Sequence, residues 1–141
     1  MKILIATDAY FPQVNGVVRT LHETGKILKE QGHRIEYITP ELFLTFPMPK
    51  YNEIRIAINV WPKVGSLIKK IKPDAIHIAT EGPIGTMARR YCLKNNLKFT
   101  TSFHTRFDKY LKLYFPIIPA KWAEKFLANF HNKAERILVT T

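Results

Sequence analysis

Apolar side chains recur along the chain in two alternating patterns. Short β-branched runs of strand length are separated by longer stretches in which apolar residues follow a helical spacing. The strand-like runs are "KILIAT" (2–7), "RIEYIT" (34–39), "EIRIAI" (53–58), "DAIHIA" (74–79), "KFTTSF" (98–103) and "RILVTT" (136–141). Six such runs joined by crossovers predict an α/β fold, namely one doubly wound, Rossmann-like parallel β-sheet with helices on both faces.

Three of the intervening stretches carry helix signals. Residues 17–31 have apolar positions at helical spacing and are followed by Gly32, a residue typical of a helix stop. The segments "VGSLIKKI" and "GTMARRYCLKNN" follow the same pattern, and Pro83 stands near the expected start of the second of them. The segment "PELFLTFPMPKYN" is expected to be a loop.

The length of 141 residues predicts a single domain, 1–141, large enough to bury its own core. No apolar run approaches the roughly 18 residues that a membrane-spanning helix needs. Asp8 interrupts the short apolar run at the N-terminus, so we expect no signal peptide. Cys92 is the only cysteine, which excludes an internal disulfide and favours a cytoplasmic location.

The net charge of +11 is distributed unevenly. Residues 1–60 carry 7 basic and 6 acidic side chains, whereas residues 61–141 carry 15 and 5. This excess indicates an anionic partner, which could be a nucleic acid, a phosphorylated small molecule or an anionic membrane surface. Charge alone does not choose among them.

Candidate chemistry gathers in the loops that follow the strands, where doubly wound sheets bind their ligands. Asp8 follows the first strand, and its carboxylate suits either a general base or a loop cap. Gly16 ends the same loop, where it allows either an anion site at the next helix or a plain Asn-Gly turn. Glu81 in "TEGPIG" could bind an anion or a hydroxyl, or could belong to a simple strand-to-helix turn.

The segment "TSFHTRFDKY" places His104 and Arg106 at the same predicted edge of the sheet. Together they could bind a phosphorylated substrate and stabilise charge in a transition state, or they could belong to a solvated loop. His77 lies inside a strand between isoleucines, which favours a structural role. His33 and Cys92 have no neighbours at metal-ligand spacing, so no metal site is expected.

Four ordered segments resemble the N-terminal domain of the retaining glycosyltransferases of family 4, which have the GT-B architecture of two facing Rossmann-like domains. The segments are "TDAYFPQVNGVVRTL", "PMPKYNEIRIA", "HIATEGPIG" and "TSFHTRFDKY". They are most similar to the group that uses nucleotide-diphosphate hexoses such as GDP-mannose. The resemblance implies transfer of a mannose- or glucose-type hexose to a lipid or saccharide acceptor, without a metal or other cofactor.

The resemblance also implies roles for individual residues. Gly16 matches the glycine whose backbone faces the donor diphosphate, and His104 matches the histidine beside the donor sugar, which we expect to be catalytic. Asp8 and Tyr10 would lie on the acceptor side, with Asp8 as a second catalytic candidate. Glu81 and Arg106 match substrate-binding positions of the motifs.

The family's chains continue into a donor-binding domain that carries most nucleotide contacts and is absent from these 141 residues. We therefore expect the isolated chain to be inactive until it is combined with that domain. A peripheral contact with an anionic membrane is a further expectation, since Lys121, Lys125 and Lys133 flank an aromatic stripe and "LFLTFPMP" (42–49) is apolar.

Two other classes remain open. A noncatalytic nucleotide- or phosphate-binding module would have the same fold. A nucleic-acid-binding module would use the basic second half, but Trp122, Phe126 and Phe130 recur at helical spacing, which is typical of a buried stripe. No nucleic-acid partner is therefore expected.

Overall fold

A five-stranded parallel sheet forms the centre of the computed structural model, which describes residues 1–11, 13, 16–48, 51–103, 117 and 119–139. Its strand order is β2-β1-β5-β6-β7. The chain moves outward from β1 to β2 in one direction and from β5 to β7 in the other, so the boundary between β1 and β5 is a topological switch point. The strands are β1 (Lys2–Ala6), β2 (Arg34–Ile38), β5 (Ala75–Ile78), β6 (Thr100–Phe103) and β7 (Arg136–Val139).

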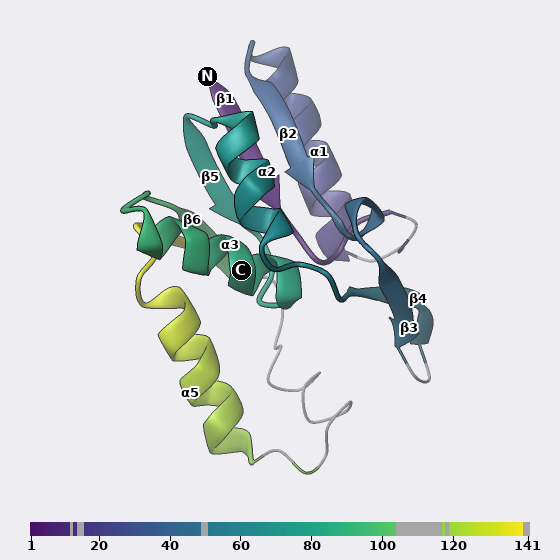
Figure 1. Ribbon diagram of the computed structural model, residues 1–141. Coiled ribbons are helices and arrows are strands. Elements are labelled where there is room, and N and C mark those ends of the chain that lie inside the picture. Colours follow the sequence, from purple (N-terminus) through teal and green to yellow (C-terminus); the bar gives the residue numbers. More distant parts are fainter. Residues whose placement is uncertain (12, 14–15, 49–50, 104–116, 118, 140–141) are drawn as a thin grey trace.

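Helices cover both faces of this sheet, as predicted (Figure 1). Helix α1 (Gly16–Glu30) packs on one face through Leu21, which joins Ile5 and Ile35 in a small buried cluster. The larger cluster on the other face includes residues of α2 (Lys63–Ile71) and α3 (Pro83–Lys94). The helix bounds lie within two residues of the predicted ones. Gly32 follows α1 with a φ of 92°, which a glycine adopts without strain.

The predicted count of six parallel strands is wrong. The run "EIRIAI" does form a strand, β4 (Tyr51–Ala57), but β4 pairs antiparallel with β3 (Thr45–Met48) in a separate two-stranded sheet. The segment read as a loop therefore contains η1 (Pro40–Leu42) and β3. An alternating apolar pattern predicts a strand but not its partner, because pairing is decided by residues distant in sequence.

The hairpin formed by β3 and β4 has an unusual outer face. Phe43, which precedes β3, and Ala57 belong to the main core. Phe46 is 43% exposed, and Leu44 and Ile58, which adjoin the strands, are 66% and 57% exposed. An antiparallel sheet with one face on the core normally presents polar side chains on the other. In Figure 1 the hairpin follows β2 and η1 and lies away from the central sheet.

Helix α5 (Ala120–His131) and strand β7 complete the described structure. The helix buries Ala123, Leu127 and Phe130 but leaves Trp122 70% and Phe126 42% exposed. The predicted buried stripe is therefore wrong at Trp122 and Phe126 and right at Phe130, because the inward face of α5 is offset by one residue. All four residues of β7 are exposed at the edge of the sheet.

Candidate functional site

The loops that follow β1 and β5 lie on the two sides of the topological switch point. Asp8 lies in the loop after β1. It contacts the start of α3, the helix that follows the loop after β5. Its Oδ1 accepts a hydrogen bond from the Ile84 amide at 2.8 Å, and its Oδ2 accepts bonds from the Gly85 amide at 3.2 Å and the Thr80 hydroxyl at 2.7 Å. Asp8 therefore caps α3 from a distant part of the chain.

Glycines allow this close approach. A Cβ on Gly82 would lie 2.4 Å from Asp8 Cγ, and a Cβ on Gly85 would lie 1.8 Å from the Thr80 carbonyl oxygen. Burial of the carboxyl group raises the pKa of Asp8, with a smaller contribution from the negative charge of Glu81, while the bonds from Thr80, Ile84 and Gly85 act in the opposite direction. The structure thus brings Asp8 and Glu81 together, and a role of Asp8 as a general base stays a prediction.

Tyr10 forms an aromatic cluster with neighbouring rings. Its ring lies 5.2 Å from that of Phe11 and 5.0 Å from that of Tyr37 in β2, and Phe11 in turn contacts His22 of α1. Burial, followed by the effect of Tyr10, raises the pKa of Tyr37 to about 12. The loop after β1 is therefore anchored to both β2 and α1.

Gly16 begins α1, so the first-turn amides of this 15-residue helix follow the same loop. Nothing lies within 4 Å of the position that a Cβ on Gly16 would occupy, and the first turn carries no acidic side chain. The helix dipole favours an anion at such a position.

Glu81 is buried, at 9% exposure, in a polar cluster that the sequence did not predict. Its Oε1 lies 2.8 Å from Nε2 of His131, and Nδ1 of His131 lies 2.7 Å from the hydroxyl of Thr101. One signal was available in the sequence: His131 lies four residues after Leu127 and eight after Ala123, on the buried face of α5.

The remaining candidates fall into two groups. His104, which directly follows the last residue of β6 in the sequence, and Arg106 both lie outside the described residues. His77 is structural, as predicted: its ring nitrogens lie 2.7 Å from the Thr100 hydroxyl and 2.6 Å from the Ser102 hydroxyl. Among the described residues no group of three or more His, Cys, Asp or Glu side chains could hold a metal ion.

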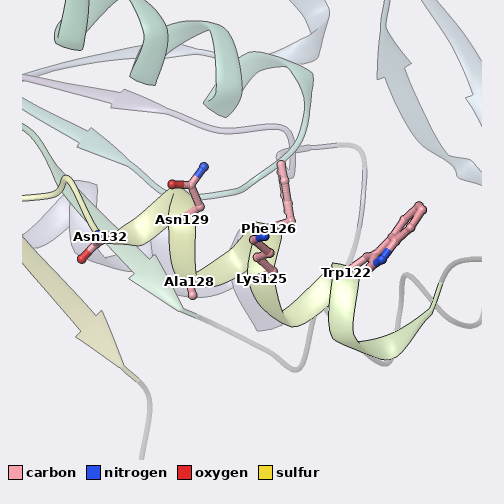
Figure 2. A pocket seen from close by; sticks show the side chains of 6 residues that line it. All are labelled: Trp122, Lys125, Phe126, Ala128, Asn129 and Asn132. Atoms are coloured by element: carbon pink, nitrogen blue, oxygen red, sulfur yellow. The ribbon is translucent and has the colours of Figure 1, made fainter.

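A broad concavity of about 930 Å³ lies along α5 and is separate from the loops after β1 and β5. Figure 2 shows its lining within the described residues, which comes from α5 and from Asn132 directly after it. The described residues that line it are Trp122, Lys125, Phe126, Ala128, Asn129 and Asn132. This concavity is an open surface of aromatic and amide groups. The site around Asp8 and Glu81 consists instead of enclosed polar contacts. In the described part of the chain, no helix has the length and apolar character needed to cross a membrane.

Comparison with known proteins identifies relatives of this chain. It is 24% identical to an alpha-monoglucosyldiacylglycerol synthase of Streptococcus pneumoniae over 79% of the chain and 28% of that protein. It is 24% identical to a GDP-mannose-dependent alpha-mannosyltransferase of Corynebacterium glutamicum, over 98% of the chain and 37% of that protein. A sulfoquinovosyl transferase of Arabidopsis thaliana is 25% identical over 79% of the chain and 24% of its own length.

The chain thus spans between about a quarter and about two fifths of the length of these relatives. The sequence description of Glycosyltransferase Family 4 matches residues 14–141, which includes every described element from α1 onward. With its parallel sheet flanked by helices, the chain belongs to glycosyltransferase family 4.

Proposed function

We propose that this chain is the acceptor-side half of a retaining glycosyltransferase. The complete enzyme would transfer a mannose- or glucose-type hexose from a nucleotide-diphosphate sugar to a lipid or saccharide acceptor. Membership of family 4 supports the reaction class, and the names of the Streptococcus and Corynebacterium relatives support a glucose- or mannose-type sugar.

The observation that carries the proposal is the arrangement at the β1–β5 switch point. The carboxyl group of half-buried Asp8 interacts electrostatically with that of buried Glu81 there, and the loop that contains Asp8 leads to the first turn of α1 at Gly16. The first turn of α1 suits a diphosphate, while carboxylates suit the hydroxyl groups of a sugar or glycerol. Donor and acceptor chemistry would therefore meet at one edge of the sheet.

In the proposed mechanism the protein stabilises charge and holds the two substrates in place. Negative charge develops on the leaving diphosphate, where the Gly16 amide and the first turn of α1 would stabilise it, while the diphosphate helps to deprotonate the acceptor hydroxyl. His104 would lie beside the donor sugar, and Arg106 would bind substrate. The nucleotide itself would be held by a second, donor-binding domain, without a metal ion.

A transfer assay with several nucleotide hexoses tests this function. The isolated chain should be inactive, whereas addition of a matching donor-binding domain, in trans or fused after Thr141, should give transfer with retained configuration. In the complemented protein His104→Ala should lower turnover by roughly 10²-fold, the scale of losing one preorganised contact. Transfer by the isolated chain would refute the half-enzyme proposal, and full activity of the His104 variant would refute the role of this imidazole.

We also propose that the chain binds peripherally to the surface of an anionic membrane at its cytoplasmic side. The exposed residues Trp122 and Phe126 adjoin exposed Lys121 and Lys125 in the sequence of α5, and exposed Lys133 follows the helix. Aromatic rings favour the interface of a bilayer, and each basic group near an anionic surface adds about 1 kcal/mol of attraction. The apolar outer face of the β3–β4 hairpin would border the lipid.

The two tryptophans of the chain test this contact separately, because both are exposed and they lie on different elements. Trp61→Phe leaves Trp122 as the only fluorophore on α5, and Trp122→Phe leaves Trp61 near the hairpin. With vesicles of phosphatidylglycerol and phosphatidylcholine, each emission should shift to shorter wavelength. Equal binding to vesicles of phosphatidylcholine alone would contradict the proposal.

A further inference from the structure

A buried polar cluster connects three separate parts of the fold at the candidate site. Glu81 comes from the loop after β5, Thr101 from β6 and His131 from the last residue of α5. Their exposed fractions are 9%, 0% and 6%, and the two contacts that join them measure 2.8 and 2.7 Å. The imidazole of His131 therefore uses both ring nitrogens within the cluster.

The surroundings hold the His131 ring in place. It packs edge-on against Phe103 and Phe130, with centroid distances of 5.8 and 5.2 Å. The end of α5 is further secured by Arg89, which donates hydrogen bonds to the carbonyl oxygens of Phe130 at 2.8 Å and Asn129 at 2.9 Å. A ring fixed in this way can set the orientation of a carboxylate bound to it.

Only one of the two oxygens of the Glu81 carboxylate has a hydrogen-bond partner among the described residues. Within the described residues His131 contacts Oε1, and no protein group donates a hydrogen bond to Oε2. A buried carboxylate oxygen without a donor is costly, so such an atom calls for a partner from beyond the described residues. Its place in the loop after β5, on the ligand side of the sheet, is where a substrate would supply that donor.

We propose that His131, together with Thr101, is a positioning residue that holds Glu81 so that Oε2 accepts a hydrogen bond from a hydroxyl group of the acceptor. This inference rests on the proposed function, since it assumes that the acceptor binds at this edge. A hydroxyl of a glycerol backbone and a hydroxyl of a sugar ring offer the same donor, and the experiments below distinguish the two. His131 itself touches no substrate.

Steady-state kinetics of the complemented enzyme test the positioning role. A charge-assisted hydrogen bond is worth roughly one to two factors of ten in binding, so His131→Ala should raise the acceptor KM about tenfold. The donor KM should stay within about twofold, and His131→Gln, which keeps one N–H donor toward Glu81, should recover part of the loss. In a Glu81→Gln background the His131 substitutions should change the acceptor KM by less than about twofold.

His77 provides a matched control. It is another histidine of the same domain, with both ring nitrogens in contact with hydroxyl groups, but the hydroxyls belong to Thr100 and Ser102 and not to the Glu81 cluster. His77→Ala should lower the free energy of unfolding without a selective rise in acceptor KM. The inference is overturned if folded His131→Ala keeps a normal acceptor KM, or if His77→Ala produces the same selective rise.

A second measurement does not depend on transfer. Nitrogen-15 resonances of the His131 ring in the isolated chain should shift when dihexanoylglycerol or methyl α-mannopyranoside is added, and Glu81→Gln should abolish the shift. A response to the glyceride or to the glycoside would identify the acceptor chemistry. No response to either probe refutes the inference even if transfer is detected, whereas a response without transfer in the complemented protein refutes only the proposed function.

Discussion

At the scale of single residues, Asp8 couples the stability of the fold to pH. Its pKa is raised above the ordinary value of 3.8, so between 3.8 and the folded pKa the native state binds more protons than the unfolded state. The contribution of Asp8 to the free energy of unfolding should therefore fall as pH rises through this window and then stay constant. Asp8→Asn should remove that slope.

Urea denaturation of both proteins at several pH values measures this effect as a difference. Asp74→Asn is a suitable control, because Asp74 Oδ2 also accepts a backbone hydrogen bond, from the Lys2 amide at 2.7 Å, but at an exposed site. In the Asp74→Asn control, the free energy of unfolding should still fall with pH through the Asp8 window. If the difference in the free energy of unfolding between wild type and Asp8→Asn does not change with pH, the prediction is contradicted.

The glycines around Asp8 should differ sharply in their tolerance of a methyl group. Gly85→Ala would place a Cβ 1.8 Å from a backbone oxygen, which cannot move without disturbing the loop. We expect a loss of about 2 to 3 kcal/mol in the free energy of unfolding. Gly16→Ala, which meets open space, should change it by less than about 0.5 kcal/mol. Similar thermal midpoints for the two variants would show that the contact at Gly85 is unimportant.

Sequence reasoning located Asp8 and Glu81 because strand ends are visible in the hydrophobic pattern. It did not reveal what their carboxylates bind, because Ile84, Gly85 and His131 reach them only after the chain has folded. The position of Thr80 beside Asp8 was equally hidden, since 72 residues separate the two. The chemistry of a residue was readable from the sequence, but its partners were not.

At the scale of elements, the end of α5 should depend on Arg89. This guanidinium binds the Asn129 and Phe130 carbonyl oxygens, and it lies 5.6 Å from the centre of the Phe130 ring. Arg89→Ala should cost about 1 to 3 kcal/mol in the free energy of unfolding and should also raise the acceptor KM, because His131 follows directly.

The neighbouring Arg90 is exposed and serves as the matched control. Arg90→Ala should leave the unfolding free energy within about 0.5 kcal/mol of the wild type. Chemical denaturation and steady-state kinetics of the two variants give both readouts. Equal effects of the two substitutions would mean that Arg89 does not anchor the helix.

Among the elements, the three predicted helices and the five strands of the main sheet were readable from the sequence, whereas β3 was not. Pro47 lies within β3 and lacks an amide hydrogen, which argues against a strand in any local reading. The hairpin tolerates it in a two-stranded sheet, where each strand has a free edge. The local sequence therefore did not predict β3, because this strand depends on its pairing with β4.

At the scale of the whole molecule, the protection of backbone amides from hydrogen exchange should decrease from the centre of the sheet to its edge. Strand β1 pairs on both sides, with β2 and β5, and contains Leu4, Ile5 and Ala6, all nearly inaccessible to solvent. Strand β7 pairs with β6 on one side, and its side chains are exposed. Amide hydrogen exchange should therefore be slowest in β1 and β5 and much faster in β7. Comparable rates in β1 and β7 would contradict the described packing.

The exposure of β7 also has a practical meaning for work with the isolated chain. Ile137, Leu138 and Val139 are 46%, 56% and 67% exposed on a strand at the edge of the sheet, with apolar side chains on both of its faces. Such an edge is a template for pairing with another copy, and natural proteins usually protect it with charge or a covering segment. Concentrated preparations of these 141 residues should therefore aggregate through β7. The substitution Leu138→Lys should reduce this aggregation, because it places a charge on the exposed edge strand.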